Sequence, residues 1–209
     1  MVAAHARLWV RRAGPELTPP IRHAATLILW RDGPQVLMGQ RGAKAAFMPS
    51  KYVFPGGAVD PIDTGTPNLS PECRSRLSLN APDAPTPEAL AACALRELAE
   101  ETGLHLHPTA RLTFIFRAIT PAGSPRRFDA RFFLANASDS TGDPDDFSDA
   151  QDELSHLHWI GLTEARHLDL PFITEIVLAE VAALLNGHPQ PGVPFFDNSG
   201  PVPQFRRLT

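Results

Sequence analysis

The sequence predicts an α/β fold in which a mixed β-sheet is covered by helices. Runs with a strand-like apolar pattern alternate along the chain with runs of helical pattern, which is typical of a sheet packed between helices. With 209 residues, 43% of them hydrophobic, the chain can bury a substantial core. A single domain is expected at this length, and the chain has no internal repeat.

The first predicted elements are two strands and a glycine turn. Residues 24–30 and 35–40 are strand-like runs, and Arg31-Asp32-Gly33-Pro34 between them is a hairpin signal. The turn Phe54-Pro55-Gly56-Gly57 follows. Its two glycines would let the backbone approach another group closely, because no side chain stands in the way.

A loop and a long helix come next. Residues 61–86 are rich in proline and small polar residues, which predicts a surface loop with one short helix near residues 72–79. Thr86 then suits the N-cap of a helix that has Pro87 in its first turn. Gly103 suits a left-handed cap at its C-terminal end.

The second half of the chain continues the alternation of strands and helices. We expect a strand pair at residues 111–119 and 127–135, a short strand at 156–160, a brief helix near 163–167 and a longer helix at 172–185. Asn186-Gly187 would end that last helix.

The predicted domain occupies residues 21–187 and is flanked by two segments. Residues 1–20 form an N-terminal extension, and residues 188–209 form a proline-rich tail without a periodic apolar pattern. Three arrangements of the tail stay open: it wraps a surface, contributes to a homodimer, or is loose.

Composition argues against several classes of partner. The formal net charge of −4 gives no basic surplus for nucleic acid or anionic lipid. Cys73 and Cys93 do not make a disulfide framework, so we expect free thiols and a cytoplasmic protein. The apolar stretch at residues 1–10 is too short for a signal peptide, and no 18-residue apolar run predicts a membrane span.

Three glutamates of the long predicted helix indicate the chemistry. The i, i+3, i+4 spacing of Glu97, Glu100 and Glu101 puts their carboxylates on one helix face, where like charges repel one another. A hard divalent cation such as Mg²⁺ would offset this repulsion. The alternative is a solvated helix face on which Arg96 pairs with Glu100.

The surrounding residues resemble the Nudix hydrolase signature, G-x5-E-x7-R-E-U-x-E-E-x-G-U, where U is a bulky aliphatic residue. Every fixed position from Glu88 to Leu104 matches. The first half departs from the pattern, because about 25 additional residues lie between Gly57 and Glu88. This insert, at about residues 61–86, would either roof the substrate site or be a neutral surface decoration.

The resemblance implies an α/β/α sandwich and the metal-dependent hydrolysis of a pyrophosphate linkage. Glu97, Glu100 and Glu101 would hold Mg²⁺ or Mn²⁺, with a backbone carbonyl at Gly57 or Ala58 as a further ligand. The resemblance also implies that Arg96 orients the glutamates through hydrogen bonds, a task that suits a guanidinium.

Two further carboxylates have open roles. Glu88 precedes Glu97 by nine residues, about half a turn out of phase on an ideal helix. It reaches the metal only from a non-helical approach, and otherwise it is a favourable charge at a helix N-terminus. Glu153 is a candidate general base at the end of an acidic loop. The other acidic residues of this loop are expected to be solvated carboxylates; they are Asp143, Asp145, Asp146, Asp149 and Asp152.

A second phosphate of the substrate would need cations, for which Arg41, Arg127 and Arg131 are candidates. Because side chains alternate along a strand, Arg127 and Arg131 share a face with Asp129. This polar face either meets the ligand or is an exposed, ion-paired strand surface.

The substrate itself is expected to be a small nucleotide. Residues 47–60 and 119–133 resemble an interrupted-box branch that includes peroxisomal coenzyme A diphosphatases and bacterial relatives. Coenzyme A is therefore the leading candidate, although Ser50 stands where better-known coenzyme A hydrolases carry glycine. ADP-ribose, NADH and nucleotide sugars stay open. A module that senses a nucleotide without cleaving it is the alternative, but such modules typically lose box glutamates.

Overall fold

A computed structural model describes residues 19–209, and most of the predicted N-terminal extension lies outside the described residues, as does the segment weighed as a signal peptide. The described chain forms a nine-stranded mixed sheet in the order β3-β2-β1-β6-β5-β8-β9, with β4 paired to β1 and β7 paired to β2. The strands are β1 (Ile21–Arg31), β2 (Gln35–Arg41), β3 (Tyr52–Val53), β4 (Gly56–Ala58), β5 (Thr113–Ile119), β6 (Arg127–Asn136), β7 (Leu154–Gly161), β8 (Val193–Asp197) and β9 (Gln204–Leu208).

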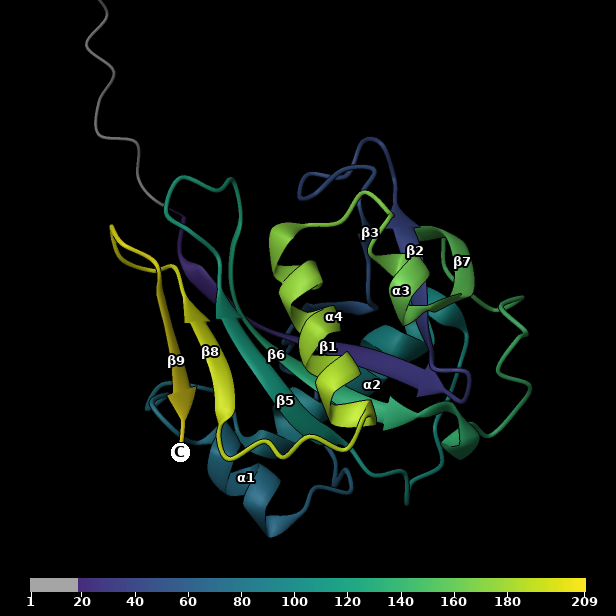
Figure 1. The fold of residues 1–209 in the computed structure, drawn as a ribbon, viewed down its shortest axis with the longest axis horizontal. Coiled ribbons are helices and arrows are strands. Elements are labelled where there is room, and N and C mark those ends of the chain that lie inside the picture. The colour runs from purple at the N-terminus through teal and green to yellow at the C-terminus, as the bar shows by residue number, and fades with distance from the viewer. Residues whose placement is uncertain (1–18) are drawn as a thin grey trace, which may run out of the picture.

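Helices cover both faces of this sheet, which confirms the predicted α/β/α sandwich. In Figure 1, α4 lies in front of the sheet and α2 lies behind it. The helices are α1 (Pro71–Leu77), α2 (Pro87–Thr102), α3 (Leu162–Ala165) and α4 (Phe172–Leu185), with a 3₁₀ turn η1 (Ala137–Asp139) after β6.

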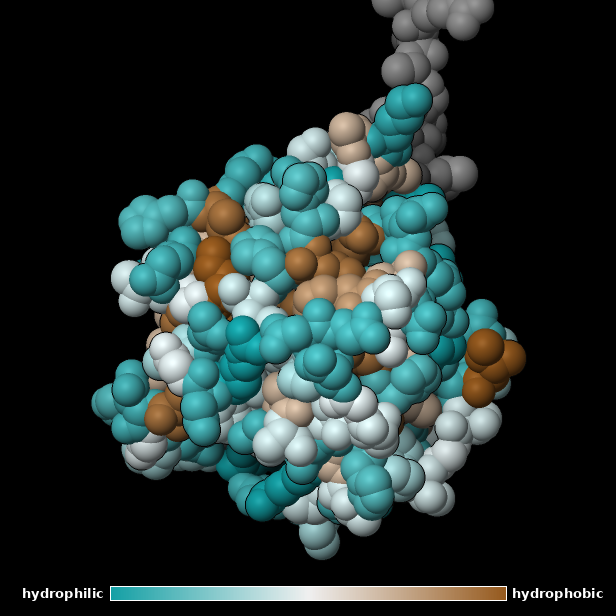
Figure 2. Space-filling model, turned by 90° about the vertical axis from the view of Figure 1, so that its right-hand side faces the viewer, coloured by the Kyte–Doolittle hydropathy of each residue, from teal (hydrophilic) through white to brown (hydrophobic). Residues whose placement is uncertain are grey.

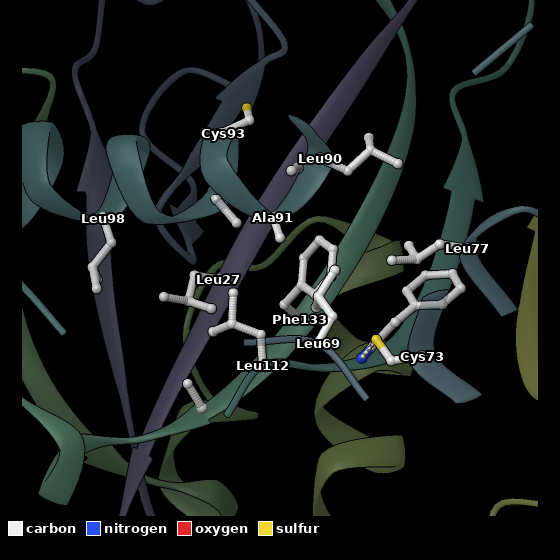
Figure 3. Packing of buried hydrophobic residues seen from close by; sticks show 14 of the residues in the cluster. Leu27, Leu69, Cys73, Leu77, Leu90, Ala91, Cys93, Leu98, Leu112 and Phe133 are labelled. Atoms are coloured by element: carbon white, nitrogen blue, oxygen red, sulfur yellow. Dashed lines mark hydrogen bonds between the residues drawn. The ribbon is translucent and has the colours of Figure 1, made fainter. Parts of the chain in front are cut away.

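The strand β1 is buried on both faces, so it separates two hydrophobic cores. Leu27 and Leu29 face the core under α1 and α2, whereas Ile28 faces the core under α4. Figure 3 shows Leu27 below α2 among the side chains of the first core. Successive side chains along a strand point to opposite faces of the sheet, and helices cover both faces at β1.

The predicted helix ends are confirmed in α2. The Thr86 hydroxyl accepts a hydrogen bond from the Ala89 amide at 3.2 Å, and Pro87 occupies the first turn. Gly103 adopts φ = 74°, and its amide donates to the Ala99 carbonyl. The hairpin at residues 31–34 is also confirmed, since Arg31 pairs with Gln35.

The insert belongs to the core rather than to the surface alone. Leu69, Cys73 and Leu77 are buried and pack in the same cluster as the apolar face of α2. The predicted short helix of the insert is α1, whose N-cap Ser70 accepts from the Cys73 amide at 3.1 Å. A neutral surface decoration is therefore the wrong description of this segment.

The tail is also part of the sheet, so the expectation that residues 188–209 lie outside the domain is wrong. Strand β8 pairs in parallel with β5, and β9 pairs antiparallel with β8. Val193, Phe195 and Leu208 are buried in the core under α1 and α2. Parallel pairing with a strand far away in the sequence leaves no local sequence signal. The apolar run of β8 is short and lies among prolines, which are unfavourable in strands.

Two expected properties can be checked in the described residues. Cys73 and Cys93 are buried free thiols, as predicted. None of the helices within residues 19–209 is both long and apolar enough to cross a bilayer.

We expect Phe195→Ala to lower the free energy of unfolding by about 3–5 kcal/mol, because it removes a large buried side chain from the core. Phe195 is 1% exposed, whereas Phe205 on the neighbouring strand is 57% exposed. The control Phe205→Ala should cost only about 1 kcal/mol. Urea unfolding of both variants measures the difference, and equal small losses would contradict the role of the tail in the core.

Candidate active site

A cavity of about 720 Å³ brings together most of the predicted site residues. Its charged lining comes from distant parts of the chain and consists of Arg22, Arg41, Asp60, Arg96, Glu97, Glu100, Arg126 and Glu153. Its apolar lining includes Phe47, Met48, Phe128, Phe132, Phe172, Ile173 and Phe196. Figure 2 shows one face of the molecule, where hydrophobic side chains gather in a recess bordered by hydrophilic ones. The cavity is large enough for a nucleotide-sized ligand.

Helix α2 carries the glutamates into this region. Glu97 is 9% exposed and Glu101 is 2% exposed, while the Glu100 side chain is 40% exposed. A solvated helix face is therefore the wrong description of Glu97 and Glu101, whereas the predicted pairing of Arg96 with Glu100 is present at 2.8 Å. Two buried carboxylates on consecutive turns need compensating partners, because desolvation of a charge is costly.

The glycine turn lies directly against these carboxylates. A Cβ atom on Gly57 would come within 2.3–2.6 Å of the Glu97 carboxylate, so any larger residue would displace that carboxylate from its position. The strand β4 holds the turn in place, since Gly57 pairs with Ala25 of β1. The Gly57 carbonyl accepts a weak hydrogen bond from the Cys93 thiol at 3.6 Å.

Each of the three glutamates uses one oxygen for a hydrogen bond from the protein. Arg96 Nη1 donates to Glu97 Oε1 and to Glu100 Oε2, both at 2.8 Å. The Gly56 amide donates to Glu101 Oε2 at 2.8 Å. Glu101 Oε1 is buried and has no hydrogen-bond partner. A buried oxygen left without a donor fits a bound cation.

These residues fit a cation that takes some of its ligands from the protein and the others from water and substrate. Within residues 19–209, no three acidic, histidine or cysteine side chains converge into a ready-made metal cage. Mg²⁺ commonly uses only one or two carboxylates and completes its octahedron with water and phosphate oxygens. Glu97, Glu100, Glu101 and the Gly57 carbonyl suit that mode of binding.

Burial raises the pKa of Glu101 to about 8, with the nearby Glu97 carboxylate adding to the effect. The Gly56 hydrogen bond acts in the opposite direction but is weaker. Burial also raises the pKa of Glu97, while Arg96 opposes that shift. The positive charge of Arg96 therefore compensates only part of the cost of burying these carboxylates, and a cation would compensate more of it.

Arg96 is held by a residue that the sequence did not reveal. Its Nε donates to Asp63 Oδ1 at 2.7 Å and its Nη2 donates to Asp63 Oδ2 at 3.1 Å. Burial is the largest influence on the pKa of Asp63 and raises it, but the hydrogen bonds from Arg96 and the Asp60 amide, together with the charge of Arg96, lower it below its usual value. Asp63 lies in the insert, 33 residues before Arg96, so no motif links them.

Glu153 and Arg41 both line the cavity and pair with each other. Arg41 Nη2 lies 2.8 Å from Glu153 Oε1, and the Glu153 side chain is 56% exposed. The predicted roles of Glu153 as general base and of Arg41 as substrate ligand stay predictions.

Glu88 lies elsewhere, so its predicted catalytic role needs correction. It occupies the first turn of α2, and its carboxylate accepts from Arg74 Nε at 2.7 Å. This hydrogen bond is the main reason that its pKa is lowered. Glu88 therefore joins the insert to the N-terminus of α2. Because it lies about half a turn out of phase with Glu97, it faces away from the glutamate cluster.

Arg127 and Arg131 also do not line the cavity, so the prediction that their strand face meets the ligand is wrong. Arg131 is fully buried and lies 2.9 Å from Asp129, which also binds Arg117 at 2.8 Å. Arg127 is 7% exposed and donates to the Thr120 carbonyl.

The face of β6 that lines the cavity is the apolar one. Phe128, Ala130 and Phe132 border the cavity, as the alternation of side chains requires once Arg131 faces the other way. The additional cations of the cavity are Arg22, near the start of β1, and Arg126, just before β6. Their positions at strand starts gave no signal of their own, because many strands begin with exposed charges.

The insert contributes little roof to the cavity. Of its residues and their neighbours, only Asp60 and Ile62 border the cavity, while α1 packs against the core. The expectation that the insert covers the substrate site therefore holds only for its first few residues.

The NUDIX domain family model matches residues 20–181 of this chain. The fold is similar to that of a NUDIX hydrolase from Alicyclobacillus acidocaldarius, with a TM-score of 0.56 and 28% identity, over 78% of this chain and 92% of that chain. It is also similar to a MutT NUDIX hydrolase from Burkholderia pseudomallei (TM-score 0.52, 23% identity, 78% of this chain and 98% of that chain).

A third similar structure is the NUDIX domain of Shewanella oneidensis NrtR complexed with ADP ribose. Its TM-score is 0.54 at 14% identity, over 83% of this chain and 94% of that chain, which shows a common fold. No curated protein sequence matches the chain.

We expect the metal-free protein to lose stability as the pH rises from about 4.5 to about 8. The pKa of Glu101 is raised from 4.5 to about 8, so in this range the folded chain keeps a proton that the unfolded chain has released. The free energy of unfolding therefore falls with each unit of pH, and the total loss over this range is on the order of a few kcal/mol.

Urea unfolding in EDTA at pH 5 and pH 8 measures this loss. Glu101→Gln should remove a large part of it, because glutamine does not titrate. An unchanged pH dependence in Glu101→Gln would show that the carboxyl of Glu101 is not the group responsible.

Proposed function

This chain belongs to the Nudix family and is a pyrophosphohydrolase, and we propose that it cleaves, with Mg²⁺ or Mn²⁺, a nucleoside diphosphate linked to another moiety. The observation that carries the proposal is the set of carboxylate oxygens left without protein donors beside a cavity. Glu101 Oε1 is the best defined of them, because it is buried and unpaired. Glu101 itself does not line the cavity but accepts a hydrogen bond from Gly56, which does. A nucleotide sensor would not need to keep all the box glutamates.

The residues of the chain would share the work as follows. Glu97, Glu100, Glu101 and the Gly57 carbonyl would hold the metal. When bound, the metal neutralises charge on the phosphoryl oxygens and lowers the pKa of water. Glu153, the candidate general base, would take a proton from the attacking water, and its partner Arg41 holds its carboxylate in place. Hydrolysis then adds one water across the P–O–P linkage.

Coenzyme A stays the leading substrate because the cavity offers both aromatic surface and remote cations. Phe47 packs edge-on against Phe128, with ring centroids 5.3 Å apart, in the apolar lining. Ala25 pairs with Gly57, and Arg22 lies three residues earlier on the same strand, about 10 Å away at 3.3 Å per residue. A phosphate remote from the diphosphate would suit this spacing. Cytoplasmic location and a homodimer stay predictions.

The first test is hydrolysis of coenzyme A, ADP-ribose, NADH, nucleotide sugars and nucleoside triphosphates, with Mg²⁺ or Mn²⁺. We expect metal-dependent cleavage of at least one diphosphate, and a loss of 100-fold or more in kcat for Glu101→Gln, on the order expected when a catalytic metal ligand is removed. Glu88→Gln is the matched control, because it removes a box carboxylate that faces Arg74 rather than the cavity.

The Glu88→Gln control should keep its activity within about threefold of the wild-type protein. If no compound is cleaved while a nucleotide binds tightly, the chain is a sensor instead. Chromatography of the products identifies the phosphate bond that is broken.

Arg22 and Arg126 should select substrates that carry a phosphate remote from the diphosphate. We expect Arg22→Gln and Arg126→Gln to lower kcat/KM for coenzyme A by about tenfold each, since a charged hydrogen bond contributes about 1.5–3 kcal/mol. The kcat/KM for dephospho-coenzyme A should change little. Arg166→Gln, at an exposed arginine outside the cavity, is the control. Equal losses on both compounds would argue against a remote-phosphate subsite.

A further inference from the structure

The guanidinium of Arg96 has all five of its N–H groups engaged. Nε and one N–H of Nη2 bind the two oxygens of Asp63, and the second N–H of Nη2 reaches the Ala58 carbonyl at 3.2 Å. The two N–H groups of Nη1 bind Glu97 and Glu100. Because a guanidinium has five donors in a fixed plane, these bonds leave it one orientation.

The forked edge of Arg96, formed by Nε and Nη2, belongs to Asp63 alone. Arginine binds carboxylates most strongly through two parallel N–H groups, and Asp63 occupies that mode. Glu97 and Glu100 therefore receive a single hydrogen bond each. The second oxygen of each glutamate stays outside the grip of the guanidinium.

Asp63 is itself rigidly placed. Its side chain is 1% exposed, and its Oδ2 also accepts from the Asp60 amide at 2.7 Å. The Asp63 amide in turn donates to the Asp60 carbonyl at 2.9 Å, so the turn closes on itself at the start of the insert. A buried, fixed carboxylate of this kind can set the orientation of its partner.

We propose that Asp63 is a positioning residue that keeps Arg96 from clasping a metal-binding glutamate. Without the Asp63 carboxylate, the forked edge of Arg96 is free to bind Glu100, one helical turn away, or Glu97 through both oxygens. Those oxygens would then be lost to the cation. The insert thus supplies a functional part of the site, an inference that rests on the proposed metal-dependent function.

The test is Asp63→Asn, which keeps the shape but not the charge. In either orientation of the asparagine amide, its NH₂ faces an N–H donor, because Arg96 and the Asp60 amide approach both oxygens of Asp63. We expect the Mn²⁺ dissociation constant of the substrate-free protein, measured from the electron paramagnetic resonance of free Mn²⁺, to rise about tenfold.

Activity gives the second measurement. The metal concentration for half-maximal hydrolysis should rise by about the same factor, while KM at saturating metal changes little. A purely structural role would lower the amount of active protein and leave both metal constants unchanged, and that result would overturn the proposal. Asp83→Asn is the control, since Asp83 is an exposed residue of the same insert that binds His23 only through its main-chain carbonyl.

Asp63→Glu keeps the inference testable if Asp63→Asn does not fold. The longer side chain retains the charge but displaces the guanidinium, so a smaller rise in the Mn²⁺ constant is expected, and no rise would overturn the proposal. If the wild-type protein cleaves no diphosphate, the proposed function fails, yet the Mn²⁺ measurement still decides whether Asp63 controls cation binding.

Discussion

The burial of two carboxylates on consecutive turns of one helix is the constraint on which much of this structure depends. Glu97 and Glu101 are both largely removed from solvent, and burial raises the pKa of each. Taking such charges out of water costs several kcal/mol unless donors or cations compensate. The protein supplies only part of that compensation, through Arg96 and the Gly56 amide. The carboxylate oxygen left without a donor, Glu101 Oε1, would favour the binding of a cation.

The elements around α2 can be understood as supports for this arrangement. Strand β4 pairs with β1, and this pairing keeps the two glycines next to the carboxylates. A side chain at Gly57 would collide with Glu97. The insert also contacts α2 through two ion pairs, Asp63 with Arg96 and Arg74 with Glu88. Its apolar residues enter the core, so the insert and the catalytic helix are parts of one packed unit.

Local signals in the sequence predicted what local forces determine. Thr86 and Gly103 mark the ends of α2 because capping depends on neighbouring residues, and the i, i+3, i+4 spacing placed the three glutamates on one face. Contacts between distant residues left no such signal. Asp63 meets Arg96 only after the insert folds back, and β8 pairs with β5 across most of the second half of the chain.

The alternation of side chains along β6 also shows what a local pattern can predict and what it cannot. It separated the arginines from the phenylalanines correctly, but it could not decide which face meets the cavity. That choice depends on the folded chain, where Arg117 and Arg131 are buried on the other face and both pair with Asp129. Neither arginine lines the cavity, and Arg131 is fully buried, so neither side chain meets a substrate phosphate there. The apolar face of β6 is then the one available for a ligand.

The charge distribution of the cavity also constrains how a diphosphate would enter. Arg41 and Arg96 of the cavity lining are already paired with Glu153, Glu97 and Glu100. The cavity cations outside these pairs are Arg22 and Arg126, which would attract an anionic linkage. A diphosphate without its cation would therefore be held by the arginines, away from the carboxylates. Only a bound cation reverses the local sign at the glutamates, so metal and substrate are expected to bind there together, with the apolar part of the ligand against the phenylalanines.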